Sequence, residues 1–216
     1  MRFQAIIFDC DGTLVDSEHV GNEVLVDCVA ELGLRLSLEE ALRCFAGRKM
    51  ADTIAMIEQR LGYPVPETFL ANLRDRMADA FEARLKPMDG VQDLLETLRI
   101  PVCVASNGPQ EKMQVSLRVT GLLHHFENRI FSGYDCGSWK PEPGLFLHAA
   151  RTMGVDPKQC AVVEDSPLGV RAGVAAGMTV FGYAPGASGP TLAAVGAKVF
   201  RHMSCLLPEL QSHNPV

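Results

Sequence analysis

Short apolar runs that end in polar residues recur along the chain. Residues 4–8 form such a run and stop at Asp9, which is typical of a buried parallel strand. After residue 86, similar runs alternate with segments of helical pattern. The strand-like runs lie at 101–105, 129–132, 160–164, 178–181 and 198–200, and the helical segments at about 110–120, 143–153 and 167–176. This alternation predicts an α/β fold with a doubly wound, Rossmann-like parallel sheet.

Residues 17–86 instead have an entirely helical pattern. Val20, Val24 and Cys28 follow a spacing of four residues, so one face of the first helix is apolar. Further helices are predicted at 38–45, 50–61 and 67–85.

The two patterns divide the chain into two predicted domains. Residues 1–15 and 87–216 form a discontinuous α/β core, and residues 16–86 form an inserted, all-helical domain. The insertion begins just after the carboxyl end of the first strand, where open α/β sheets bind ligands. We therefore expect the insertion to act as a cap.

Charge and composition narrow the possible partners. The 216 residues carry 20 Lys and Arg against 26 Asp and Glu, a formal net charge of −6. This acidic balance, without a basic run, disfavours nucleic acid and anionic membranes as partners. No apolar stretch approaches the roughly 18 residues of a membrane helix, and the N-terminal run lacks a signal cleavage site. We expect a cytoplasmic protein; the sequence does not define its oligomeric state, and a monomer is the working expectation.

Seven cysteines, an odd number without a C-x-x-C pair, indicate reduced thiols. Cys10 lies between Asp9 and Asp11, and two neighbouring carboxylates raise the pKa of a thiol rather than lower it. We therefore interpret Cys10 as a packing residue and not as a nucleophile.

Residues capable of chemistry follow the first predicted strand. Asp9 and Asp11 are two carboxylates two residues apart, and Gly12 allows a tight turn directly after them. The hydroxyl of Thr13 is suited to hold a carboxylate in place. A D-x-D-G turn also begins calcium loops, but the remaining acidic ligands of such a loop are missing here.

Later segments add complementary groups. Ser106 and Asn107 follow the second predicted strand and suit an anion such as phosphate. Lys140 lies between a tryptophan and a proline, a poor place for a mobile, solvated side chain, so it is a candidate for a fixed positive charge toward phosphate. Taken alone, such a motif is more often a surface loop. Glu164 and Asp165 end another apolar strand with hard oxygen ligands of the kind that Mg²⁺ prefers.

Taken in order, these motifs resemble the haloacid dehalogenase-like hydrolase superfamily. They are D-x-D-G-T at 9–13, the serine of 106–108, the lysine of 140–141 and the acidic pair at 164–165. The resemblance covers essentially the whole chain and includes a helical cap of the phosphoglucomutase-like type. The motif order is most similar to a bacterial branch that resembles 6-phosphogluconate phosphatase.

The resemblance implies a phosphatase for a small phosphate ester, such as a sugar phosphate or a sugar-acid phosphate. Asp9 is expected to attack phosphorus and form an aspartyl-phosphate, and Asp11 to act first as acid and then as base. Mg²⁺ is expected on Asp9, the Asp11 backbone carbonyl and Asp165, with Glu164 acting through water. Four carboxylates and a phosphate in one cleft require such a cation.

The resemblance also assigns the binding groups. Phosphoryl oxygens are expected to contact Thr13, Ser106, Asn107 and Lys140, and Lys140 is also expected to be catalytic.

In the cap, the segment with Gly47, Arg48 and Lys49 interrupts two predicted helices with two cations, at a helix N-terminus whose dipole disfavours them. We expect it to bind the non-reacting end of the substrate, with Lys49 as the first choice and Arg48 as the second.

Three alternatives are weighed against a phosphatase. A sugar phosphomutase of the β-phosphoglucomutase type shares the nucleophile, metal and cap, and the motifs do not exclude it. A non-catalytic binding protein on the same scaffold is disfavoured because every expected catalytic position is filled. A dinucleotide-binding module is weaker still, since no G-x-G-x-x-G follows the first strand.

The neighbouring His124 and His125 are interpreted as a surface turn whose side chains diverge, not as a metal pair.

Overall fold

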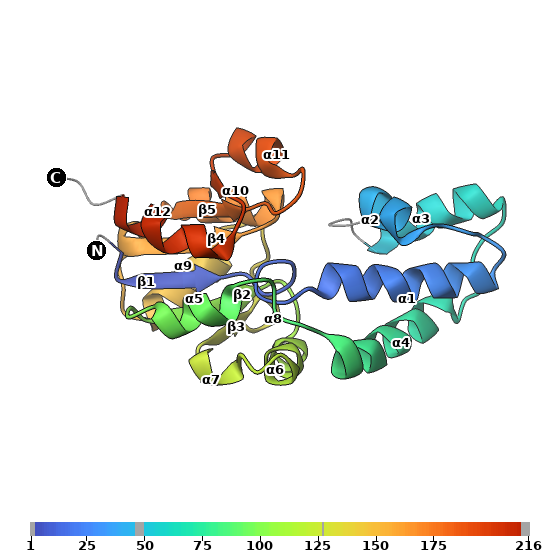
Figure 1. The fold of residues 1–216 in the computed structure, drawn as a ribbon, viewed down its shortest axis with the longest axis horizontal. Helices are drawn as coiled ribbons and strands as arrows, with labels where there is room; N and C mark the ends of the chain where they lie inside the picture. Colours follow the sequence, from blue (N-terminus) through green and yellow to red (C-terminus); the bar gives the residue numbers. More distant parts are fainter. Residues whose placement is uncertain (1–2, 46–49, 127, 213–216) are drawn as a thin grey trace. The chain divides into compact units, whose positions relative to one another are not determined.

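The computed structural model describes residues 3–45, 50–126 and 128–212 of the chain (Figure 1). The chain splits into two compact units, one formed by Met1–Val15 with Pro87–Val216 and the other by Asp16–Lys86.

The first unit is built on a parallel sheet. Among the described residues the sheet has six strands in the order β3-β2-β1-β4-β5-β6, and each neighbouring pair is parallel. The order runs outward from β1 in both directions, so the predicted doubly wound α/β fold is confirmed. The strands are β1 Ala5–Phe8, β2 Val102–Ser106, β3 Ile130–Ser132, β4 Cys160–Glu164, β5 Thr179–Tyr183 and β6 Lys198–Phe200.

Helices connect these strands. Three of them, α6, α9 and α10, lie where the sequence predicts helices. The shorter α5, α7, α8, α11 and α12 were not predicted, because a segment of one or two turns is too short to display a helical period. The helices are α5 Val91–Thr97, α6 Gln110–Val119, α7 Leu123–Phe126, α8 Gly133–Cys136, α9 Gly144–Thr152, α10 Pro167–Ala175, α11 Gly189–Ala194 and α12 Leu206–Ser212, with 3-10 helices η1 Pro157–Gln159 and η2 Met203–Cys205.

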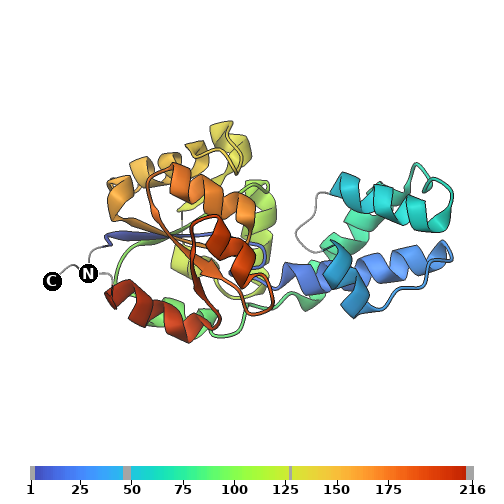
Figure 2. The ribbon, with the colours of Figure 1, turned by 90° about the horizontal axis from the view of Figure 1, so that it is seen from above.

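Both faces of the sheet are covered, so the central strands β1 and β4 are buried along their whole length. Figure 2 shows α9 and α10 on one side of the sheet and α5 and α12 on the other. Successive side chains of β1 point to opposite faces of the sheet, as in any pleated strand. Ile7 belongs to the core cluster that includes Phe146 of α9. Phe8 instead contacts Phe126 of α7 edge-on, with ring centroids 6.4 Å apart.

The second unit contains four described helices, α1 Ser17–Glu31, α2 Leu38–Phe45, α3 Met50–Leu61 and α4 Phe69–Arg84. Val24 and Cys28 of α1 are buried in a cluster with Ile57 and Leu73, so the spacing of four does mark the apolar face. Asp16 caps α1, since its carboxylate accepts a hydrogen bond from the His19 backbone N–H at 3.4 Å. No described helix has both the length and the apolar character needed to cross a membrane.

All seven cysteines lie among the described residues, and all are free thiols. Burial raises the pKa of Cys10 well above its ordinary value, and the charges of Asp11 and Asp9 raise it further. Cys10 is 1% exposed, so it packs in the core as the sequence indicates.

Candidate active site

The polar residues that follow the strands meet at the carboxyl edge of the sheet. Asp9 directly follows β1, Ser106 ends β2, Glu164 ends β4, and Asp165 comes next. Strands β1 and β4 are neighbours and begin the two halves of the sheet, so their carboxyl ends flank the crevice where such sheets bind ligands.

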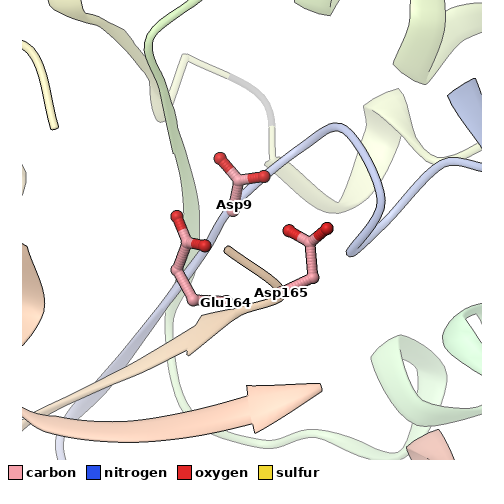
Figure 3. Close-up of side chains that lie close together, drawn as sticks. All are labelled: Asp9, Glu164 and Asp165. Atoms are coloured by element: carbon pink, nitrogen blue, oxygen red, sulfur yellow. The ribbon is translucent and has the colours of Figure 1, made fainter. Parts of the chain in front are cut away.

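Three carboxylates form a compact acidic cluster in this crevice. Oxygen atoms of Asp9, Glu164 and Asp165 lie within 4.8 Å of one another, and Figure 3 shows the three side chains together beyond the ends of their strands. Asp9 and Glu164 are buried. Carboxylates held this close repel one another unless a cation or a proton compensates them.

Lys140 supplies one compensating charge. Its ammonium donates hydrogen bonds to Asp9 and, at 2.6 Å, to Oε1 of Glu164. Only 4% of the lysine side chain is exposed, which agrees with the expectation that it is not a solvated lysine. Burial lowers the pKa of Lys140, but the two carboxylates raise it more, so the pKa lies above its ordinary value and the ammonium stays charged.

The nucleophile candidate has an unusual proton affinity. Burial raises the pKa of the Asp9 carboxyl to about 7, the charges of Glu164 and Asp11 raise it as well, and Lys140 opposes them. The negative charge on Asp9 is therefore only partly balanced by the protein itself.

Glu164 is held by both of its oxygens. Oε1 accepts from Lys140, and Oε2 accepts from both the backbone N–H and the hydroxyl of Ser166, each at 2.9 Å. The first turn of α10 packs so closely that a Cβ at Gly169 would collide with the carboxylate. The sequence assigned Glu164 to the metal through water; in the structure its direct partners are Lys140 and Ser166.

Asn107 fixes the backbone of the same lysine. Its Oδ1 accepts from the Lys140 backbone N–H at 2.8 Å, and its Nδ2 donates to the Lys140 carbonyl at 3.2 Å. The sequence assigned this amide to phosphate, whereas both of its ends contact the lysine loop here. Beside it, the hydroxyl of Ser106 accepts from the Gly108 backbone N–H at 3.2 Å.

A tight turn brings Thr13 against Asp165. Gly12 has a φ of 77°, and a Cβ at this position would collide with the Asp165 carboxylate. The buried Thr13 hydroxyl donates to Oδ1 of Asp165 at 3.2 Å. Thr13 therefore holds a carboxylate in place, which is the first of the two roles that the sequence indicated.

A second lysine, which the sequence analysis missed, contacts Asp11. The ammonium of Lys112 in α6 lies 2.8 Å from Oδ2 of Asp11. Burial lowers the pKa of Lys112, but Asp11 raises it more, and the net shift is upward. A signal was present in the sequence, because Lys112 is a cation in the first turn of a predicted helix, where the helix dipole disfavours it.

The prediction for the cap segment stays untested, and the one for the histidine pair needs a correction. Gly47, Arg48 and Lys49 lie outside the described residues. The expectation for the histidine pair was wrong in one respect: His124 and His125 lie in the short helix α7 with ring centroids 3.9 Å apart, so the side chains do not diverge. Burial and the neighbouring ring lower the pKa of His125, and a neutral ring can lie beside another without charge repulsion.

Comparison with known proteins identifies the family. The family model for haloacid dehalogenase-like hydrolases matches residues 3–177. The chain belongs to the haloacid dehalogenase-like hydrolase family, as its motifs predict.

Individual relatives agree with this membership. The chain is 38% identical to a 6-phosphogluconate phosphatase of Escherichia coli K12, over 97% of this chain and 95% of the relative. A family hydrolase from Deinococcus radiodurans, crystallised with bound phosphate and sodium, superposes with a TM-score of 0.88 at 32% identity, covering 98% of this chain and 96% of that one.

A putative β-phosphoglucomutase from Thermotoga maritima gives a TM-score of 0.83 at 26% identity, over 98% and 100% of the two chains. The family model and the Escherichia coli relative support the predicted enzyme class, a phosphatase of this family.

Proposed function

We propose that the protein is a magnesium-dependent phosphatase that hydrolyses a small phosphorylated sugar or sugar acid through an aspartyl-phosphate on Asp9. The observation that carries the proposal is the buried contact between the Asp9 carboxylate and the Lys140 ammonium, beside Asp165 at the carboxyl edge of the sheet. A nucleophile, a fixed cation and further oxygen ligands in one crevice are the groups that phosphoryl transfer needs.

The residues present fit a magnesium ion. Asp9 and Asp165 offer carboxylate oxygens within 4.8 Å of each other, and the backbone carbonyl of Asp11 would complete the protein ligands. Glu164 would support the site indirectly, because its oxygens contact Lys140 and Ser166. When bound, Mg²⁺ supplies positive charge that offsets the charge on the phosphoryl group and on Asp9.

In the first half of the reaction, an oxygen of Asp9 attacks phosphorus while the bond from phosphorus to the ester oxygen breaks. Asp11 gives its proton to the departing alkoxide, so the product leaves as an alcohol. Lys140 and Ser106 stabilise the transferring phosphoryl oxygens. Asn107 holds the backbone of Lys140 and so keeps the ammonium beside the nucleophile.

In the second half, Asp11 has become a carboxylate and accepts a proton from a water molecule. The resulting hydroxide attacks phosphorus, the bond to Asp9 breaks, and inorganic phosphate leaves. The two half-reactions together return both aspartates to their starting states.

The choice of substrate rests on the relatives. The similarity of this chain to a 6-phosphogluconate phosphatase makes a phosphorylated sugar acid the first candidate substrate. A β-phosphoglucomutase activity is the second candidate, favoured by the similarity to the Thermotoga maritima protein. A mutase needs a sugar bisphosphate to stay phosphorylated, whereas a phosphatase turns over without one.

Phosphate release tests the proposal. Wild-type protein is assayed on 6-phosphogluconate, other sugar phosphates and p-nitrophenyl phosphate, with Mg²⁺ or with a chelator, and with or without a sugar bisphosphate. We expect magnesium-dependent release that needs no bisphosphate. Asp9→Asn is expected to lose at least about three orders of magnitude of activity, because an amide cannot form the acyl phosphate.

The matched control is Asp93→Asn, which changes an exposed aspartate on α5 in the same way. The control is expected to keep wild-type rates. Substantial turnover by a wild-type-free preparation of Asp9→Asn would refute the assignment of the nucleophile.

A further inference from the structure

A second lysine at the site has no role in the mechanism above. The ammonium of Lys112 lies 2.8 Å from Oδ2 of Asp11, and 41% of the Lys112 side chain is exposed. Lys140 contacts Asp9 and is almost completely buried. The two candidate reacting carboxylates thus have different lysine partners, one buried and one exposed to solvent.

The position of Lys112 is unfavourable for the helix that carries it. The residue lies in the first turn of α6, where the helix dipole disfavours a cation. An exposed ion pair adds only about 0–1 kcal/mol to stability, so folding gives little reason for the contact. A cation kept at this place is better explained by what it does to Asp11.

The stem of Lys112 passes beside the loop expected to bind phosphate. A Cβ placed on Gly108 would be 3.8 Å from Cδ of Lys112 and 3.7 Å from Oγ of Ser106. Both are ordinary van der Waals distances, so the lysine stem lies directly against this loop. The helix that follows the loop therefore carries its cation back toward Asp11.

We infer that Lys112 is a positioning residue for Asp11 in the proposed phosphatase reaction, and this inference rests on the proposed function. When Asp11 carries its proton on Oδ1, the Lys112 ammonium donates to Oδ2, which restrains the rotation of the carboxyl group so that the proton leaves from Oδ1. Proton transfer requires the acid within about 2.6–3.2 Å of the ester oxygen, so a restrained carboxyl spends more time in reach.

Two kinds of substrate should differ in how much they depend on Lys112. An alkyl ester such as 6-phosphogluconate has a poor leaving group, and its first step needs the acid. The p-nitrophenolate of p-nitrophenyl phosphate leaves without a proton. Loss of a positioning residue for the acid should therefore slow the first turnover of the alkyl ester selectively.

The test compares Lys112→Met, which keeps the stem and removes the charge, with Lys112→Arg, which keeps the charge. The matched control is Lys158→Met, an exposed lysine in η1 at the opposite edge of the sheet. First-turnover rates of alcohol release are measured by rapid quench on both esters, and thermal melting checks that each variant is folded.

We expect Lys112→Met to slow the first turnover of 6-phosphogluconate by about 10- to 100-fold and that of p-nitrophenyl phosphate by less than about threefold, since acid catalysis contributes to only one of them. Lys112→Arg should recover most of the lost rate, and Lys158→Met should match wild type on both esters.

Equal losses on the two esters would overturn the inference and make Lys112 a general phosphate-binding or structural residue. Unchanged rates in Lys112→Met would reduce the ion pair to a surface contact. A wild type that releases no phosphate from any ester overturns the proposed function and this inference together, so the two failures are distinguishable.

Discussion

The ammonium of Lys140 contacts the carboxylate of Asp9, and the two side chains are 4% and 10% exposed. Glu164 shares the same ammonium at 2.6 Å, so two carboxylates compete for one cation. The pKa of Asp9 is raised to about 7, with burial as the largest cause. Ionisation of Asp9 therefore destabilises the folded, metal-free protein.

The destabilisation by ionised Asp9 predicts how the stability of the metal-free protein depends on pH. Because the pKa of Asp9 rises from 3.8 to about 7 on folding, the folded state holds a proton that the unfolded state has lost between these pH values. The Asp9 contribution to stability is therefore present below the unfolded pKa and is lost as the pH rises through about 7. Asp9→Asn removes this ionisation, so its metal-free form should be more stable than wild type at about pH 8, and the gap should narrow toward about pH 4.

Urea unfolding in the presence of a chelator, at several pH values, measures this difference. The Asp93→Asn protein serves as the control for an exposed aspartate. A metal-free wild type that is more stable than Asp9→Asn at high pH would contradict the sign of the prediction.

Magnesium affinity should depend on Asp165 directly and on Thr13 indirectly. Asp165→Asn is expected to weaken the apparent Mg²⁺ affinity by more than about tenfold, because an amide oxygen is a poorer ligand than a carboxylate. Thr13→Val removes only the hydrogen bond to Asp165 and should have a smaller effect in the same direction. The shift of the melting temperature with Mg²⁺ reports affinity without relying on activity; identical titrations for wild type and Asp165→Asn would exclude Asp165 as a ligand.

Asp11 is expected to matter most for poor leaving groups. Asp11→Asn should slow the first turnover of an alkyl phosphate far more than that of p-nitrophenyl phosphate, because only the alkoxide needs a proton in that step. Steady-state rates should fall for both esters, since the amide leaves the second step without a base. The p-nitrophenol burst separates the two steps, and equal burst losses for both esters would argue against Asp11 as the acid.

The prediction for Lys49 and Arg48 still rests on the sequence, since both lie outside the described residues. If Lys49 binds the carboxylate of a sugar-acid phosphate, Lys49→Ala should weaken kcat/KM for that substrate by about 1.5–3 kcal/mol, the range for a charged hydrogen bond. Activity on p-nitrophenyl phosphate, which lacks such a tail, should change little. Arg48→Ala serves as the comparison, and unchanged kinetics in both variants would assign the segment to the solvated surface.

Local patterns in the sequence determined where the long elements lie and which residues end the strands. The strand at Cys160–Glu164 and the helix at Met50–Leu61 have the predicted bounds, because an apolar period and its end are properties of neighbouring residues. The sequence also determined that Asp9 and Asp165 approach each other, since the carboxyl ends of parallel strands share one edge.

Only the tertiary structure decided which partner each polar side chain takes. Asn107 could serve phosphate or the protein, and the choice of the Lys140 backbone joins residues 33 positions apart. The ion pair of Asp11 with Lys112 spans 101 positions. Such pairings depend on distances of a few ångströms between loops, and those distances are set by how helices pack on the sheet, which no local pattern encodes.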